Sequence, residues 1–531
     1  MKKFIVLGLI GLIAMAFSAT VYAQPKLEFR GSGALEATSF LYRNISSGAT
    51  GDAIATRWGG GGFPYAPGAP GNGFRPDTIY VDPRDSGAWD RTNSYMEYRG
   101  ILRFDAIMGK ELSGTFVFEI DSSRWGDGAG SAAAGSAQRG TSGFWTADRS
   151  SVEVKNMYID VGLPYFGIPV PMNVRVGIQP FGMRPHMFMI TDGAGITGGI
   201  KIDPVTIGLY WAKVLEGKDA TADDVDVYGL SVNAKFGTIT AGGYAFNFNM
   251  NTYPLTNVQS VYSVTGANQN EANFWWLGLY MDGKLGPVNV NFDFVYDTGK
   301  VERRLTSAVH DVDYNGFATQ LKVDYPWEKF NFGVLGMYAS GADLNKTSLS
   351  GLPGTNNPNT GTASTKVGSY VIPPGSEEWA AWGESLIFSN NFITATALPL
   401  GMWPSLGTYP GQVNRGAIGG TWIAKLYASV KATPWYKVTL QGLYLGDTTQ
   451  HGNTLGDARK ANGRLRDDST IGWEFDLINE IQIYKNLKWS IGAGYLLAGK
   501  ALDQYGGSLA SAPAESPKDP WILATKLRYD F

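Results

Sequence analysis

Trp521-Ile-Leu-Ala-Thr-Lys-Leu-Arg-Tyr-Asp-Phe531, the last stretch of the chain, alternates between apolar and polar side chains. Successive side chains of a β-strand point to opposite faces, so the segment has one apolar and one charged face. The apolar set is Trp521, Leu523, Thr525, Leu527, Tyr529 and Phe531, and the other is Ile522, Ala524, Lys526, Arg528 and Asp530. A soluble sheet would turn the apolar face to a core, whereas an outer-membrane barrel would turn it to lipid and the charged face to the lumen.

The same alternation recurs through most of the chain, most clearly in Val288–Asp297 and Tyr314–Tyr325. Each segment offers roughly 10 residues of alternation, the length that a tilted strand needs to cross a bilayer. About 18 such segments can be placed, and single-chain bacterial outer-membrane barrels have even strand numbers. The sequence therefore predicts an all-β chain, a transmembrane antiparallel up-and-down β-barrel of about 18 strands.

The connections between these segments alternate between short turns and long loops. Gly286-Pro287 and Lys485-Asn486 are short turns, whereas long loops are expected at about 44–92, 124–150 and 340–415. Outer-membrane barrels show this asymmetry because one rim faces the periplasm and the other the outside. We therefore expect short periplasmic turns and long extracellular loops.

One segment departs from the alternation. In Val152–Val161 the apolar set moves from even to odd positions near Asn156. A β-bulge changes the facing of a strand in this way. The sequence predicts a bulge here, with a wrongly placed strand as the alternative.

The composition excludes several classes of protein. Apolar residues make up only 44% of the 531 residues, which excludes a protein with many apolar helical spans. Aromatic residues reach 13%, which suits aromatic belts at membrane interfaces. The formal net charge of -3 gives no basic bias toward nucleic acid. With no cysteine, disulfides, thiolate metal sites, iron–sulfur clusters and covalently attached c-type haem are excluded, and we expect no cofactor.

The first residues have the features of an export signal. Met1–Lys3 is basic, Phe4–Phe17 is almost uninterruptedly apolar, and Val21-Tyr22-Ala23 has small residues at the two critical positions. We expect cleavage before Gln24, which leaves 24–531 as a single barrel domain after a signal peptide of 1–23; an uncleaved anchor is the alternative. The predicted location is the outer membrane of a Gram-negative bacterium.

A closed barrel of about 18 strands has a lumen too wide for wall side chains to fill. Charged residues on the inward set, together with one from a loop, are predicted to line it: Arg99, Arg103, Glu119, Arg175, Arg184, Asp293, Lys322, Glu474, Asp476, Lys526 and Arg528. Their signs are mixed. They could pair across strands and hydrate the wall, or they could form opposed charges at a constriction.

Two loops are candidates for narrowing the lumen. Phe181–Ala194 would place Arg184, His186 and Asp192 at the constriction. The other is Ser340–Arg415, whose centre, Glu377–Phe388, is predicted to form a short helix and whose segment Leu398-Pro-Leu-Gly-Met-Trp403 is too apolar for a freely solvated loop. This second loop would enter the lumen as a plug, pack against a neighbour at the outer surface, or fold on itself as an ordinary surface loop.

Several segments resemble porin-like outer-membrane proteins, including the alginate-export porin family. Arg175-Val-Gly-Ile-Gln-Pro-Phe-Gly182 resembles the family's strand-into-loop segment, with Ile178 where a basic residue is usual. Gly472-Trp-Glu-Phe-Asp-Leu477, followed by Tyr484-Lys-Asn-Leu-Lys-Trp489, resembles its penultimate hairpin. A final strand that ends in Phe resembles the closing strand that the barrel assembly machinery recognises. The resemblance implies the barrel fold, and the change at Ile178 weakens the implication of an anionic polysaccharide as the solute.

The expected function is a porin for passive or semi-selective passage of small hydrophilic solutes, with membrane lipid and the assembly machinery as partners and a homo-oligomer as one option. The alternatives are a barrel for polysaccharide export, a sheath for an electron-transfer partner, and an adhesin or purely structural barrel. An enzyme is not expected, because His186, His310 and His451 are accompanied by no nucleophile elbow or HExxH motif. Asp223, Asp224 and Asp226 lack the spacing of a calcium loop, which favours solvated charge.

Overall fold

The computed structural model describes residues 26–43, 92–125, 152–163, 170–185, 187–216, 224–253, 270–304, 309–348, 351–373, 384–388, 418–456, 458–505, 514–515 and 519–531. The predicted signal peptide, most of the predicted loop at 44–92 and His186 lie outside these residues. In the described part, no helix is long and apolar enough to cross a membrane.

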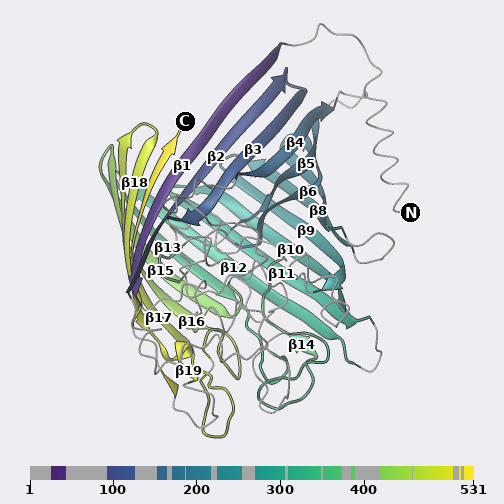
Figure 1. Cartoon of the computed structure of the whole chain (residues 1–531), viewed down its shortest axis with the longest axis vertical. Helices are drawn as coiled ribbons and strands as arrows, with labels where there is room; N and C mark the ends of the chain where they lie inside the picture. Colours follow the sequence, from purple (N-terminus) through teal and green to yellow (C-terminus); the bar gives the residue numbers. More distant parts are fainter. Residues whose placement is uncertain are drawn as a thin grey trace, which may run out of the picture.

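The described residues form a closed antiparallel barrel of 18 long strands (Figure 1). Their bounds are β1 (Leu27–Arg43), β2 (Thr92–Met108), β3 (Leu112–Arg124), β4 (Glu153–Leu163), β5 (Met172–Met183), β6 (Met189–Ile202), β7 (Val205–Leu215), β8 (Val225–Phe236), β9 (Ile239–Tyr253), β10 (Asn270–Leu285), β11 (Val288–Arg303), β12 (Val312–Trp327), β13 (Phe330–Ala339), β15 (Thr421–Thr433), β16 (Tyr436–Asp447), β17 (Thr470–Tyr484), β18 (Leu487–Ala498) and β21 (Trp521–Asp530). The shorter elements are β14 (Lys366–Val367), β19 (Gln504–Tyr505), β20 (Ala514–Glu515) and the helical turn η3 (Lys500–Leu502).

The last strand closes the barrel. β21 pairs with β18 on one side and with β1 on the other, in a register that runs from Ala34 opposite Asp530 to Arg43 opposite Trp521. The Gly33 N–H donates to the Phe531 carbonyl at 2.7 Å, and the Phe531 N–H donates to the Gly33 carbonyl at 3.0 Å. Closure removes both edges of the sheet, which is what a strand structure in lipid requires. The predicted fold is confirmed.

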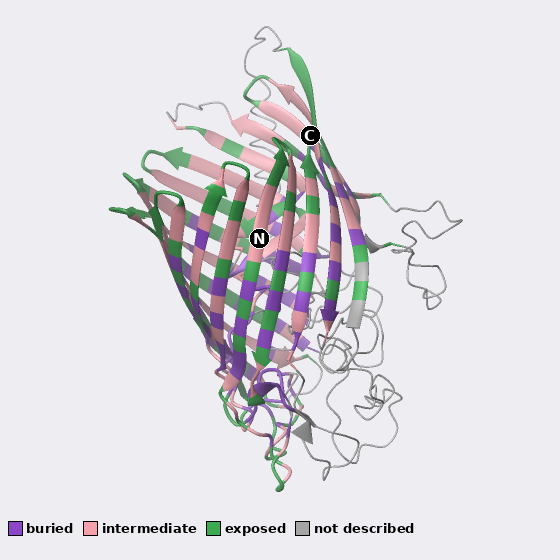
Figure 2. Ribbon diagram, turned by 90° about the vertical axis from the view of Figure 1, so that its left-hand side faces the viewer, coloured by how far each residue is buried: buried purple, intermediate pink, exposed green. Residues whose placement is uncertain are grey.

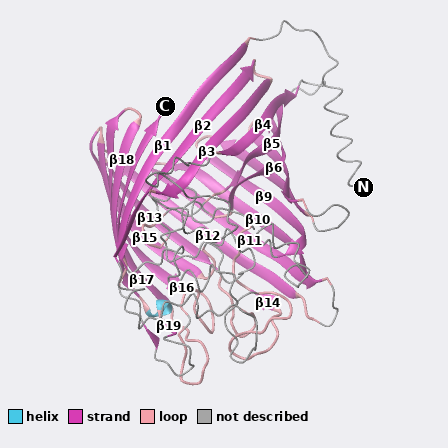
Figure 3. Ribbon diagram, viewed as in Figure 1, coloured by secondary structure: helices cyan, strands magenta, loops and turns pink. Residues whose placement is uncertain are grey.

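Short turns and long connections lie at opposite rims. We call the rim of short hairpin turns the turn rim and the other the loop rim, where the described loops gather around β14 and β19 (Figure 3). Gly237 and Gly286 stand in two of the short turns with φ of 61° and 59°, in the left-handed region that glycine adopts without steric cost.

The alternation along each strand separates an outer from an inner face, as stripes of exposed and buried residues show (Figure 2). On β21, Leu523, Leu527 and Tyr529 are exposed to the outside while Ile522 and Ala524 are buried. On β10, Trp275, Leu277 and Leu279 point outward. The outer face is thus an apolar band that suits lipid.

Two predictions about local structure have different outcomes. The bulge near Asn156 is confirmed: the register passes from Val117 opposite Asn156 to Phe118 opposite Val154, which leaves Lys155 as the extra residue. The predicted loop Phe181–Ala194 is wrong in extent, because the ladder continues through Pro180 to Met183 opposite Met189. Pro180 lacks a donor but does not stop the pairing, so the connection is only residues 184–188.

The interior is less open and less polar than predicted. Buried aromatic residues of the wall, among them Phe246, Trp276 and Tyr314, pack with residues of the loops such as Tyr370 and Phe388. Residues 367–371 and 386–388 of the 340–415 segment therefore pack with the inner face of the wall, and 384–388 is irregular rather than helical.

Candidate functional site

The connection between β5 and β6 contacts the wall at β10 and β11. Arg184 donates from Nη2 to Asp282 Oδ1 at 3.0 Å and to Asp293 Oδ2 at 2.7 Å, and it makes further short contacts with both carboxylates. Its guanidinium also lies 4.6 Å from the centre of the Tyr280 ring. Three strands, β7 to β9, separate β6 from β10 in the sheet, so the contact crosses the interior rather than following the wall. We call residues 184–188 the crossing turn.

An apolar contact holds the same turn. Phe188 is fully buried, with its ring centre 4.9 Å from Tyr244, 5.3 Å from Phe246 and 6.1 Å from Trp276. The Tyr370 hydroxyl donates to the Met187 carbonyl, which ties the turn to the long loop after β13. The crossing turn is thus fixed by an ion-pair cluster at one end and an aromatic cluster at the other.

Of the three residues predicted at this constriction, Arg184 makes the crossing contact and His186 lies outside the described residues. Asp192 stands on β6 and binds β4 instead: it accepts from Asn156 at 2.7 Å and pairs with Lys155 at 3.0 Å. Arg184 and Asp192 therefore serve different contacts.

A second feature is a row of charges on the inner wall, which we call the charged belt. It runs over β16, β17, β18, β21, β1, β2, β3, β4 and β6, and its residues are Lys437, Glu480, Lys488, Lys526, Arg528, Glu36, Arg99, Glu119, Lys155 and Asp192. Lys437 pairs with Glu480 at 2.8 Å and Arg528 with Glu36 at 2.6 Å. The charges of the belt thus pair across strands, as in the first of the two alternatives given above, in which paired charges hydrate the wall.

The belt has a local excess of positive charge. Lys488, Arg528, Glu36 and Arg99 are successive cross-strand neighbours on β18, β21, β1 and β2. Lys526 lies beside them, between Ser490 and Thr38. Among the residues that the structure describes, Lys526 forms no ion pair.

Two further predicted lining residues lie in separate pairs. Arg103 pairs with Asp105 at 2.8 Å near the turn rim, and nearly half of its side chain is exposed. Arg175 donates to both oxygens of Asp160, at 2.8 and 3.0 Å, and stacks 4.2 Å from the centre of the Tyr158 ring. Neither pair joins the contacts of the crossing turn.

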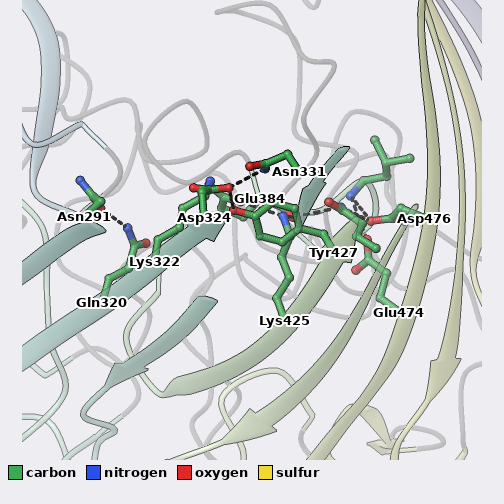
Figure 4. A network of polar contacts seen from close by, with 12 residues as sticks. Asn291, Gln320, Lys322, Asp324, Asn331, Glu384, Lys425, Tyr427, Glu474 and Asp476 are labelled. Atoms are coloured by element: carbon green, nitrogen blue, oxygen red, sulfur yellow. Dashed lines mark hydrogen bonds and ion pairs between the residues drawn. The ribbon is translucent and has the colours of Figure 1, made fainter. Parts of the chain in front are cut away.

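A third feature is a short segment against the wall, Glu384–Phe388, which we call the strap. Its Glu384 carboxylate accepts from Lys322 of β12 and Lys425 of β15, each at 2.7 Å (Figure 4). The Glu384 carbonyl accepts from Lys425 at 2.8 Å and from Gln441 of β16 at 3.1 Å. The strap thus brings a carboxylate to two lysines of the wall.

The next residues of the strap bind an acidic side chain of β17. Glu474 accepts the backbone N–H groups of Leu386 and Ile387 at 2.8 Å each and that of Phe388 at 3.0 Å. Neighbouring Asp476 accepts from Gln441 at 2.7 Å. Glu474 and the three strap residues are fully or almost fully buried. Lys322, Glu474 and Asp476, predicted separately as lining residues, are thus brought together.

Sequence reasoning missed Lys155, Asp282, Glu384, Lys425 and Gln441. Lys425 and Gln441 occupy inward positions of predicted strands, so alternation alone would have added them. Lys155 belongs to the polar set of the short stretch before the bulge, where Val152 and Val154 form the apolar set. Glu384 belongs to a loop and has no signal in the strand pattern.

Comparison with known proteins yields no match to a family model or to a curated protein. Solved structures of similar shape include OccK11 (OpdR) of Pseudomonas aeruginosa, with 10% identity and a TM-score of 0.44 over 95% of this chain and 96% of that one. A BenF-like porin from Pseudomonas fluorescens Pf-5 has 9% identity and a TM-score of 0.46 over 95% and 98%. OpdK of Pseudomonas aeruginosa with vanillate has 6% identity and a TM-score of 0.46 over 94% and 98%.

Likeness of this degree supports no statement about solutes, and none of these structures is described as an alginate-export porin. The closed antiparallel ladder stands on the chain's own strand pairing. By that ladder, the chain is a closed 18-stranded antiparallel β-barrel.

Proposed function

We propose that this chain is an outer-membrane channel for small hydrophilic solutes, with the turn rim in the periplasm. The observation that carries the proposal is a closed barrel whose outer face is apolar and whose inner wall holds a belt of paired charges. Such a wall is hydrated, and water-filled barrels conduct solutes. Residues 1–23 would be removed on export, and β21 would be the strand that the assembly machinery recognises.

The crossing turn and the strap favour a selective channel over the other candidates. Both occupy the interior, so a long polymer or a rod-like electron-transfer partner would have to displace them, whereas small solutes could pass beside them. The test is conductance of the purified full-length protein in planar bilayers. We expect long-lived ohmic pores, and correctly folded barrels without conductance would overturn the proposal.

Lys526 is expected to favour anions. A unit charge about 4 Å from an ion contributes about 1 kcal/mol in water, or about a fivefold change in local ion concentration. We therefore predict that Lys526→Gln lowers the ratio of anion to cation permeability by up to about fivefold, measured from reversal potentials in a salt gradient. Lys300→Gln, at the loop-rim end of β11, is the matched control because Lys300 is exposed and already paired with Asp311. Equal selectivity of the Lys526 variant and the wild type would contradict this role.

Acid is expected to release the strap. Burial opposes the charge of Glu384, but Lys425 and Lys322 outweigh it and lower the pKa of Glu384 below its ordinary 4.5. A carboxyl whose pKa is lowered in the docked state stabilises docking fully above pH 4.5 and loses that contribution as the pH falls through the lowered value.

We predict constant conductance from pH 7 to pH 5 and an increase below pH 4.5. Glu384→Gln, which cannot titrate at this position, should be more conductive at neutral pH and should show a smaller acid response. The same steep response in both proteins would assign the effect to other groups.

A further inference from the structure

We propose that the wall beneath the strap is a binding site for zwitterionic solutes, namely amino acids and short peptides, and that the strap occupies this site as a built-in competitor. The site consists of Lys322, Lys425, Gln441, Glu474 and Asp476, which we call the clasp patch. The proposal rests on the channel function above and names a solute class for it.

The clasp patch separates its charges by position on the wall. Lys322 and Lys425 stand on β12 and β15, whereas Glu474 and Asp476 stand on β17. Leu443 of β16 lies opposite Lys425 on one side and opposite Glu474 on the other, so these two are two ladder steps apart. At about 4.8 Å a step, their Cα atoms are about 10 Å apart. An extended tripeptide spans about the same length, at about 3.3–3.6 Å a residue.

What the strap offers to the patch is generic peptide chemistry. The lysines bind one carboxylate and one carbonyl, and Glu474 binds three successive backbone N–H groups. None of these contacts uses the side chains of Leu386, Ile387 or Phe388. A free peptide has the same groups, with an ammonium that a carboxylate pair binds more strongly than it binds neutral N–H donors.

The patch also has a binding capacity that the strap does not use. Asp476 is almost fully buried, and its Oδ1 atom accepts no hydrogen bond from the described residues. A buried carboxylate oxygen without a donor is unfavourable, so a ligand that brings another donor gains from it. An ammonium group, with three donors, can satisfy Glu474 and Asp476 together.

Hydrogen exchange of the full-length protein in detergent micelles tests the competition directly. The probe is triglycine, and the controls are N-acetyl-triglycine, which lacks the ammonium, and triglycine amide, which lacks the carboxylate. Triglycine is added at ten times its dissociation constant for the form in which the strap is undocked. The amides of 386–388 should then exchange about tenfold faster, because a competing ligand shifts the docking equilibrium by that factor. The two capped peptides should have a much smaller effect. No acceleration, or equal acceleration by all three peptides, would overturn the proposal.

Glu384→Gln provides a second test, because it weakens the strap and leaves the clasp patch intact. Triglycine should then block the ionic current with a half-saturating concentration several-fold below that of the wild type. Glu302→Gln is the matched control, since Glu302 is exposed at the end of β11 and pairs with Lys300 outside the patch. An unchanged half-saturating concentration in Glu384→Gln would count against the strap as competitor. Absence of any conductance would overturn the channel function. The hydrogen-exchange experiment does not depend on conductance and would still test whether triglycine binds the clasp patch.

Discussion

Arg184→Ala is expected to raise the single-channel conductance and to shift the selectivity toward cations. The substitution removes the only positive charge that the described contacts place between Asp282 and Asp293. Asp282 and Asp293 then lose this ion-pair partner, and the crossing turn loses its polar attachment to β10 and β11. A wider path whose net charge is more negative by one unit favours cations.

The stability of the barrel should fall as well. Breaking a buried ion pair by removing one partner costs about 3–5 kcal/mol, and we expect the lower end because the Asp282 side chain is 39% exposed. The matched control is Arg103→Ala, which removes the same type of side chain from the exposed pair with Asp105. Exposed pairs contribute at most about 1 kcal/mol, so this variant should lose little stability. It should conduct like the wild type because the Arg103–Asp105 pair does not contact the crossing turn. If both variants leave conductance and reversal potential unchanged, the crossing turn does not limit the passage of ions.

The contrast between Arg184 and Arg103 shows which features could be predicted from the sequence and which could not. Period-two alternation predicted the barrel, its closing strand and the inward direction of Arg103, whereas Arg184 was predicted to line the lumen as part of a loop. It cannot say which charges meet, since that depends on register and on contacts between distant segments. Arg184 and Asp293 are 109 residues apart, and Arg528 and Glu36 are 492 apart.

The apolar part of the interior corresponds to a sequence feature that differs from simple apolar–polar alternation. In Asn273-Phe-Trp-Trp-Leu-Gly-Leu-Tyr-Met281 both sets of alternate positions are largely apolar. A strand of this kind has lipid on one side and packed side chains on the other, as fully covered strands do. The exposed Trp275 and the buried Trp276 are the result. The crossing turn and the loops pack against the inner set. The sequence of the strand alone does not identify these partners.

Phe188→Ala is expected to have the second large effect, through the apolar end of the crossing turn. Phe188 is fully buried against Tyr244, Phe246 and Trp276. Truncation of a buried Phe to Ala typically costs about 3–5 kcal/mol, with part of the cost due to the cavity left behind. Phe188→Leu should cost less because it fills more of the space. Phe116→Ala, at an outward position of β3 that is 46% exposed, should leave the conductance unchanged.

The decisive measurement combines Phe188→Ala with Arg184→Ala in a double-mutant cycle. Each substitution alone frees one end of the same turn, and once one end is free the other contact stabilises a turn that is already partly released. The loss of stability in the double variant, measured by reversible denaturant unfolding in detergent, should therefore be smaller than the sum of the single losses. Coupling energies of residues that share one element are about 0.5–3 kcal/mol. Additive losses would mean that Arg184 and Phe188 stabilise the barrel independently, and the crossing turn would then not act as one unit across the lumen.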